Sequence, residues 1–301
     1  MAWREKSHRG FLSRTDFVHP RGLMYADTVF HRIMMVVIAV TLGMGCGGAS
    51  CPRVRFTDPE AALGTYRAAR PPVEVMRAEA RVDRRDGEGR IRGTVLMFLE
   101  APERVRFDAM TQLGPAAVLT SDGTTFALTD LRENRFYVGD ACPSNIERLV
   151  GIPLAGADVM LFLTGQTPQI EAERSDVSCE GGAYHVVLHG RDGRTQHIML
   201  QVAQEHLESP PEEQRMQLVE SRVELPDGAL EWRVTFQEHR SIAIPGAASI
   251  VMPFRVRFEH PARGIDTLVR FESIELGGQA PSDAFVQTPR PGLGVETVEC
   301  R

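Results

Sequence analysis

The chain has 301 residues, of which 34 are basic and 40 are acidic, so its net charge is −6. Residues 1–45, interpreted below as a signal, hold six of the basic and three of the acidic residues, which leaves a net charge of −9 for the remainder. This acidic balance argues against a nucleic-acid surface and against a general affinity for anionic lipid. We therefore expect no nucleic-acid partner.

A short apolar segment, Ile33 to Met44, follows His31 and Arg32 and precedes Gly45-Cys46-Gly47-Gly48. Its twelve residues fall short of the roughly 20 that a membrane-spanning helix needs. The length suits the apolar region of a secretory signal peptide. Residues 1–23 are an unusually long region to precede the apolar region of a signal peptide, and Met24 and Met34 are alternative starts of translation.

The end of this segment resembles the lipobox of bacterial lipoprotein signal peptides. The resemblance implies cleavage before Cys46, acylation of the Cys46 thiol and amino group, and a lipid anchor in the membrane. The pattern departs from the usual one because Leu42 lies four residues before the cysteine and Met44 directly before Gly45. Cys51 is a weaker rival for acylation, and a buried apolar segment with a free thiol is the alternative. Gly47 fits the outer-membrane sorting of enteric lipoproteins, which places the chain at the periplasmic face of the outer membrane.

With Cys46 acylated, an even number of cysteines remains in a compartment that permits disulfides. Pairing Cys142 with Cys179 would contribute about 4 kcal/mol on the chain-entropy estimate, and Cys51 with Cys300 would then join the two ends. The sequence allows three connectivities, and free thiols are the alternative.

Helix signals are few. Asp58-Pro59 predicts a helix through about Ala69, Ser144 to Glu147 reads as a capping box for a helix that stops at Gly151, and residues 157–163 predict a second short helix. The apolar faces of the last two exceed what exposure would tolerate. We expect them to cover the open side of a sheet.

Alternation of apolar and polar residues dominates the chain after residue 75, and it predicts strands with one buried and one solvated face. The alternating segments are 78–82, 95–99, 105–109, 126–128, 136–138, 184–188, 198–202, 232–236, 254–258 and 269–271. About eleven strands joined mostly by hairpins predict a mainly β fold with a few helices, a curved antiparallel half-barrel lidded by short helices. We expect a signal at 1–45, a lipidated linker at 46–57 and one domain at 58–301.

The segment from Arg104 to Pro168 resembles LolB, the lipoprotein that receives other lipoproteins at the bacterial outer membrane, and more distantly its periplasmic partner LolA. The likeness is carried by Leu113-Gly114, by strands around Asp122-Gly123, by Leu149-Val150-Gly151-Ile152-Pro153-Leu154 and by a helix ending Leu163-Thr164-Gly165. The resemblance implies a half-barrel with an apolar cavity for acyl chains. Partners would be lipid acyl chains or lipoproteins, and a LolA-like periplasmic carrier, with the chain itself monomeric.

The same resemblance implies that Leu113 inserts into the membrane during transfer of cargo, whereas packing of Leu113 under its own turn is the alternative. The cavity would be lined by inward residues of the strands and of the helical lid. These are Val95, Met97, Val105, Phe107, Phe126, Phe136, Leu149, Leu161 and Phe162. The rival hypothesis is a structural or assembly lipoprotein with a filled core that binds an envelope protein.

No pattern predicts an enzyme, a metal site or a cofactor. His185 and His189 have the spacing of a metal pair, but four residues of a strand span about 13 Å, which is too far to share one ion. The glycine pairs at 181–182 and 277–278 read as turns.

Overall fold

The computed structural model describes residues 50–87, 89–150 and 154–300, without the side chains of residues 149 and 150. The predicted signal and Cys46 lie outside the described residues. Contacts group residues 1–47 and 48–301 into two separate units, and the second unit is described below.

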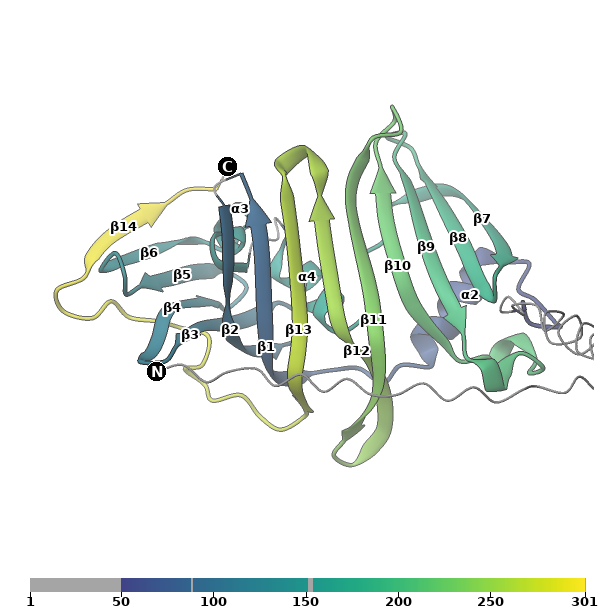
Figure 1. The fold of residues 1–301 in the computed structure, drawn as a ribbon, viewed down its shortest axis with the longest axis horizontal. Helices are drawn as coiled ribbons and strands as arrows, with labels where there is room; N and C mark the ends of the chain where they lie inside the picture. Colours follow the sequence, from purple (N-terminus) through teal and green to yellow (C-terminus); the bar gives the residue numbers. More distant parts are fainter. Residues whose placement is uncertain (1–49, 88, 151–153, 301) are drawn as a thin grey trace, which may run out of the picture. The chain divides into compact units, whose positions relative to one another are not determined.

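Within the described ranges, fourteen strands form one sheet in the order β14-β6-β5-β4-β3-β2-β1-β13-β12-β11-β10-β9-β8-β7. In Figure 1 the strands from β14 to β3 are stacked from top to bottom at the left, and those from β2 to β7 follow from left to right. Neighbouring strands are antiparallel except for β14 and β6, which are parallel. The strands are β1 (Val75–Asp86), β2 (Gly89–Glu100), β3 (Arg104–Thr111), β4 (Gly114–Ser121), β5 (Thr125–Asp130), β6 (Arg135–Asp140), β7 (Ala172–Glu180), β8 (Ala183–Gly190), β9 (Thr195–Val202), β10 (Met216–Glu224), β11 (Leu230–Ile244), β12 (Ala247–His260), β13 (Ile265–Leu276) and β14 (Gly294–Val298).

The prediction of about eleven strands is wrong, and two causes account for the missed strands β7, β14 and β10. The edge strands β7 and β14 are mostly exposed, so they need few apolar residues and show little alternation. In β10 the register shifts between Leu218 and Glu220. A bulge of this kind breaks the two-residue period on which the prediction rested.

The chain builds the sheet from two meanders. Strands β1 to β6 run outward from the middle to one edge, whereas β7 begins at the other edge and β8 to β13 return until β13 pairs with β1. The connection from β6 to β7, residues 141–171, therefore has to cross the whole sheet. It carries α3 (Pro143–Val150) and α4 (Gly156–Leu163), which lie behind the strands in Figure 1.

We call the face of the sheet that the connection crosses the inner face. Register places Ala78, Met97, Phe107, Leu119 and Leu128 side by side on it, and all five belong to the hydrophobic core. The remaining helices are α2 (Pro59–Ala68) and the short 3-10 helices η1 (Gln204–His206), η2 (Pro211–Glu213) and η3 (Pro261–Arg263). An open curved sheet covered by a few short helices is thus confirmed.

The predicted helices form close to their expected bounds. Asp58 caps α2 by accepting from the Glu60 backbone N–H at 3.1 Å. The α3 helix begins at Pro143, so Ser144 lies in its first turn, and the predicted capping box at Ser144 is wrong.

The outer face of the sheet is also covered near β2 to β5, by residues 277–293. Phe285 of this segment stacks on Phe98 at 5.4 Å, and the Gln287 amide donates to the Val118 carbonyl at 3.0 Å. The Gln287 side chain also accepts from the hydroxyl of Thr129, which pairs with Phe136 across β5 and β6. Phe136 therefore faces outward, opposite to Phe126, and its assignment to an inner cavity is wrong.

Two disulfides form among the described cysteines, Cys51–Cys179 and Cys142–Cys300. The predicted pairs, Cys142–Cys179 and Cys51–Cys300, are therefore wrong. Cys142 follows β6 and Cys179 lies in β7, which are second and fourteenth in the sheet order. Twelve strand spacings of about 4.8 Å separate them along the sheet, whereas a disulfide needs Cα atoms within about 7 Å.

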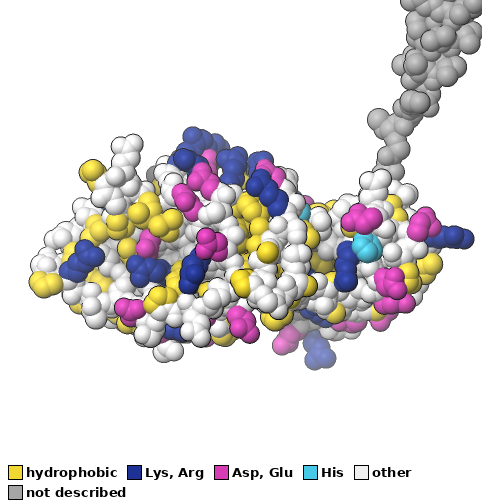
Figure 2. Space-filling view, turned by 90° about the horizontal axis from the view of Figure 1, so that it is seen from below, with side chains coloured by type: hydrophobic (Ala, Val, Ile, Leu, Met, Phe, Trp, Pro, Cys, Tyr) yellow, Lys and Arg dark blue, Asp and Glu magenta, His cyan; other side chains and the backbone are white. Residues whose placement is uncertain are grey.

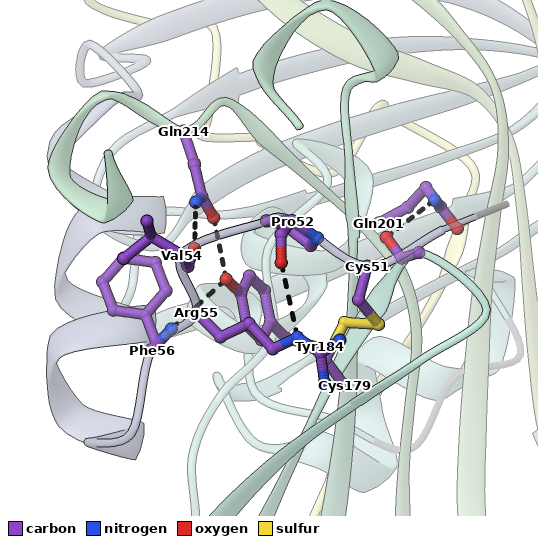
Figure 3. The surroundings of a disulfide bond; sticks show 10 residues. Cys51, Pro52, Val54, Arg55, Phe56, Cys179, Tyr184, Gln201 and Gln214 are labelled. Atoms are coloured by element: carbon purple, nitrogen blue, oxygen red, sulfur yellow. Dashed lines mark hydrogen bonds between the residues drawn. A yellow bond between two sulfur atoms is a disulfide. The ribbon is translucent and has the colours of Figure 1, made fainter. Parts of the chain in front are cut away.

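The Cys51–Cys179 disulfide fastens the N-terminal segment to the β7 edge, and Figure 3 shows the hydrogen bonds around it. The buried Gln214 amide donates to the Val54 carbonyl at 2.9 Å and accepts from the Tyr184 hydroxyl at 2.9 Å. That hydroxyl in turn accepts from the Phe56 backbone N–H at 3.3 Å. Part of the predicted linker is thus bound to the sheet.

We expect peptide mapping without reductant to recover linked peptides 51–179 and 142–300. Replacing Cys142 and Cys300 by Ser should cost about 2 to 5 kcal/mol of unfolding free energy and remove hydrogen-exchange protection from β14. The matched change of Cys51 and Cys179 to Ser should leave β14 protected. A linked 142–179 peptide would contradict the strand order.

Candidate functional site

The α4 helix fills the middle of the inner face. Its side chains Val159, Met160, Phe162 and Leu163 are buried. The Phe162 ring lies edge-on to Trp232, with centroids 5.4 Å apart, and 6.0 Å from Phe258. This short apolar helix therefore occupies the space in which the sequence predicted an acyl chain.

A close approach to the sheet sets the start of α4. Gly156 is the first helical residue, and a Cβ atom there would lie 2.6 Å from the backbone oxygen of Glu103. Only glycine allows this contact without displacing the backbone of the turn before β3.

The end of α4 is held by Tyr66 and Arg70, which we call the α4 clamp. The Tyr66 hydroxyl donates to the Gly165 carbonyl at 2.5 Å, and the Arg70 guanidinium donates to the Thr164 carbonyl at 2.6 Å and to the Val251 carbonyl at 3.0 Å. Burial raises the pKa of Tyr66, so its hydroxyl keeps the proton that it donates. The helix is thus attached to the rest of the fold by a few polar contacts and by apolar packing.

The structure gathers most of the predicted cavity residues but packs them. Val95, Met97, Val105, Phe107 and Phe126 lie on the inner face, and the last three have 0% of their surface exposed. A side chain without accessible surface touches no space large enough for water. These residues form a filled core.

On the lid, Phe162 is buried and Leu161 is half-buried. The side chain of Leu149 lies outside the described residues. Two of the three predicted lid residues can therefore be placed.

A hollow of about 970 Å³ opens at the end of the inner face beside α3, and we call it the α3 mouth. Leu128 and Tyr137 line it from a cross-strand pair of β5 and β6, and Ile91, 63% exposed, lines it from β2. Ion pairs of Arg84 with Asp86 and of Arg263 with Glu147 bring charges to the same opening.

Most of the described residues that line the mouth are charged, and its apolar members are Ile91, Leu128, Tyr137 and Pro143. Sequence reasoning missed the α3 mouth because Ile91 stands alone between two arginines, outside any apolar run.

Leu113 lies at the tip of the β3–β4 hairpin and is fully exposed, at 101% of its reference surface. The Thr111 hydroxyl shapes this turn by accepting from the Leu113 backbone N–H at 3.3 Å and donating to the Gly114 carbonyl at 2.7 Å. Leu113 therefore does not pack under its own turn, and its insertion into membranes stays a prediction.

Among the described residues, no group of three or more His, Cys, Asp or Glu side chains is placed to hold a metal ion. His189 instead contacts Asp176, with His Nε2 and the carboxylate 3.2 Å apart. In the same part of the chain, no helix is long and apolar enough to cross a membrane.

Asp158 lies in the first turn of α4, where the helix dipole favours a negative charge. Burial nevertheless raises the pKa of Asp158 above its ordinary value. Because the folded state then holds the proton more tightly than the unfolded state, this residue stabilises the fold at low pH and destabilises it as the pH rises through the raised pKa.

We therefore expect Asp158→Asn to raise the melting temperature at pH 7 and to change it much less at pH 3. Thermal unfolding at both values checks this, with the exposed Asp283→Asn as control. An equal shift at both values would show that the carboxylate charge is not the cause.

No protein-family model matches the chain, and no curated protein matches its sequence. Solved structures do match. A LolA superfamily protein from Nitrosomonas europaea is 10% identical, with 77% of this chain and 99% of that protein covered and a TM-score of 0.48. A domain provisionally named an outer membrane lipoprotein-sorting protein, from Vibrio parahaemolyticus, is 14% identical, with 75% and 95% covered and a TM-score of 0.45. A DUF1329 family protein from Desulfovibrio piger is 11% identical, with 76% and 95% covered and a TM-score of 0.47.

At these identities and TM-scores, the likenesses carry no argument about ligand or activity. The chain is thus similar in fold to a LolA superfamily protein, and likeness to LolB in particular stays a prediction.

Proposed function

We propose that the chain is a non-enzymatic envelope lipoprotein that binds acyl chains, free or on another lipoprotein, on the inner face of its sheet. The observation that carries this proposal is the α3 mouth, which opens onto the same face that α4 fills. An acyl chain would enter at the mouth and take the place of α4. A LolA-like periplasmic carrier is the donor that the resemblance suggests.

The exchange of α4 for an acyl chain is close to balanced in apolar burial. Each of the four buried α4 side chains contributes about 1.5 to 3 kcal/mol, or roughly 6 to 12 kcal/mol in all. A palmitoyl-length chain with about 15 methylene and methyl groups gains on the order of 12 kcal/mol. Whether α4 or the acyl chain occupies the core would then depend on the hydrogen bonds of the α4 clamp and on the conformational entropy that α4 gains on leaving the core.

The N-terminal attachment supports a position close to a membrane. Cys46, the proposed acylation site, precedes Cys51 by five positions, and Cys51 is bonded to the sheet edge. Five residues reach at most about 17 Å. An acyl anchor on Cys46 would thus hold the sheet near the surface of the outer membrane, on its periplasmic side.

The filled core favours a second candidate, a structural or assembly lipoprotein that binds an envelope protein. Val105, Phe107 and Phe126 have no exposed surface, so the inner face offers no open space beside them. In this case α4 would be a permanent part of the core.

Binding of a fluorescent fatty acid to the Cys46→Ser chain separates the two candidates. We expect saturable binding, which Ile91→Asp in the α3 mouth weakens about tenfold or more, since a charge there meets an acyl chain. Val295→Asp is the matched control, because Val295 is similarly exposed (59%) but does not line the mouth. The Phe162→Ala variant should bind the fatty acid more tightly, because α4 then fills less of the core. The substitution should also lower the unfolding free energy by about 3 to 5 kcal/mol.

If neither the Cys46→Ser chain nor its Phe162→Ala variant binds the probe while both remain folded, the acyl-chain proposal fails. The filled-core candidate then stands.

Membrane insertion of Leu113 can be measured separately, by sedimentation of the Cys46→Ser chain with phosphatidylcholine vesicles. Burying a leucine in lipid gains about 1.5 to 3 kcal/mol, so Leu113→Glu should lower vesicle binding roughly 10- to 100-fold. Gln112→Glu adds the same charge to the same loop and should keep most of the binding. Equal losses in both variants would assign the effect to charge and reject insertion.

A further inference from the structure

A block of arginines occupies the outer face where β2, β1, β13 and β12 lie side by side. Register pairs Arg81 with Arg270 and Arg270 with Arg255, so three arginines stand in one row across three strands. Two residues further along, Arg92, Asp83, Leu268 and Arg257 form the next row. Figure 2 shows dark blue side chains gathered at its upper edge, over the middle of the sheet.

These rows surround a hollow of about 260 Å³. Its described lining includes six arginines, Arg85, Arg90, Arg92, Arg255, Arg257 and Arg270, together with Leu268. Asp83 and Asp266 are the acidic residues among them. Positive charge thus exceeds negative charge by four in the lining, although the whole chain has a net charge of −6.

The acidic residues neutralise only part of this block. Asp83 forms ion pairs with two guanidinium groups, those of Arg90 at 2.5 Å and Arg92 at 3.0 Å. Asp266 forms an ion pair with Arg257 at 2.9 Å. Within the described residues, Arg85, Arg255 and Arg270 take part in no ion pair. Three of the six lining arginines therefore present guanidinium groups without a carboxylate partner.

The row costs stability in the absence of a ligand. Like charges directly opposite each other on neighbouring strands repel. Arg270 faces an arginine on both sides, Arg255, which has no ion pair among the described residues, and Arg81, which is paired with Glu272 at 2.6 Å. Alternation requires only a polar residue at these outward positions, which any uncharged side chain could supply. The repulsion is relieved if an anion lies between the guanidinium groups.

We propose that this hollow binds a phosphate group. Guanidinium groups match phosphate through pairs of parallel N–H to oxygen hydrogen bonds, and several of them can share one dianion. Arg255 and Arg270 would be the principal ligands, with Arg85 at the rim. The phosphate is either a soluble anion or the headgroup of a lipid.

Calorimetric titration of the Cys46→Ser chain with pyrophosphate at low salt tests the site. We expect saturable binding that weakens as salt is added, and that falls tenfold or more in the double variant Arg255→Gln, Arg270→Gln. The control is Arg132→Gln, Arg215→Gln, which removes the same charge at two exposed arginines outside the block and should change the affinity less than about twofold. The double variant in the block should melt no lower than its parent, because it removes repulsion.

Sedimentation with phosphatidylglycerol vesicles, against phosphatidylcholine vesicles, distinguishes the two sources of phosphate. Pyrophosphate binding points to a soluble anion, and vesicle binding that needs Arg255 and Arg270 but occurs without pyrophosphate binding points to a headgroup. The proposal is overturned if neither ligand binds, or if the control variant loses as much affinity as the block variant.

Discussion

The connection between β6 and β7 is the constraint on which the rest of the structure depends. These strands lie at opposite ends of the sheet order, so residues 141–171 have to cross one face of the sheet. A connection that crosses a face of apolar side chains has to be apolar, and its backbone N–H and C=O groups have to hydrogen-bond to one another. An apolar helix meets both needs. The α4 helix meets both requirements, and its place in the core follows from the path of the chain.

The same topology explains how the ends of the chain are used. A long open sheet leaves two edges with unpaired backbone groups, which are prone to pair with other chains. At one edge, Cys51 fastens the N-terminal segment to β7. At the other, β14 adds a short parallel strand to β6 and Cys300 bonds to Cys142. Each terminal segment thus secures one end of the sheet.

The two faces of the sheet also differ in the side chains that they present. The inner face is apolar and closed by α4, with an opening beside α3. On the outer face, residues 277–293 cover β2 to β5, while the arginine block beyond them remains exposed to solvent. An acyl chain and a phosphate group suit these two surfaces respectively, and both occur together in a phospholipid.

The sequence by itself determined the local features of this protein. Alternation at 78–82 or 105–109 predicted strands and their buried faces, and Asp58-Pro59 predicted α2, because these signals depend on neighbouring residues alone. Only the tertiary structure decided which cysteines pair, that Phe136 faces away from Phe126, that Phe107 lies in a filled core and that Arg255, Arg270 and Arg81 stand in one row. Each of these depends on strand order and register, which are set by contacts between residues far apart in the chain, and no local pattern records them.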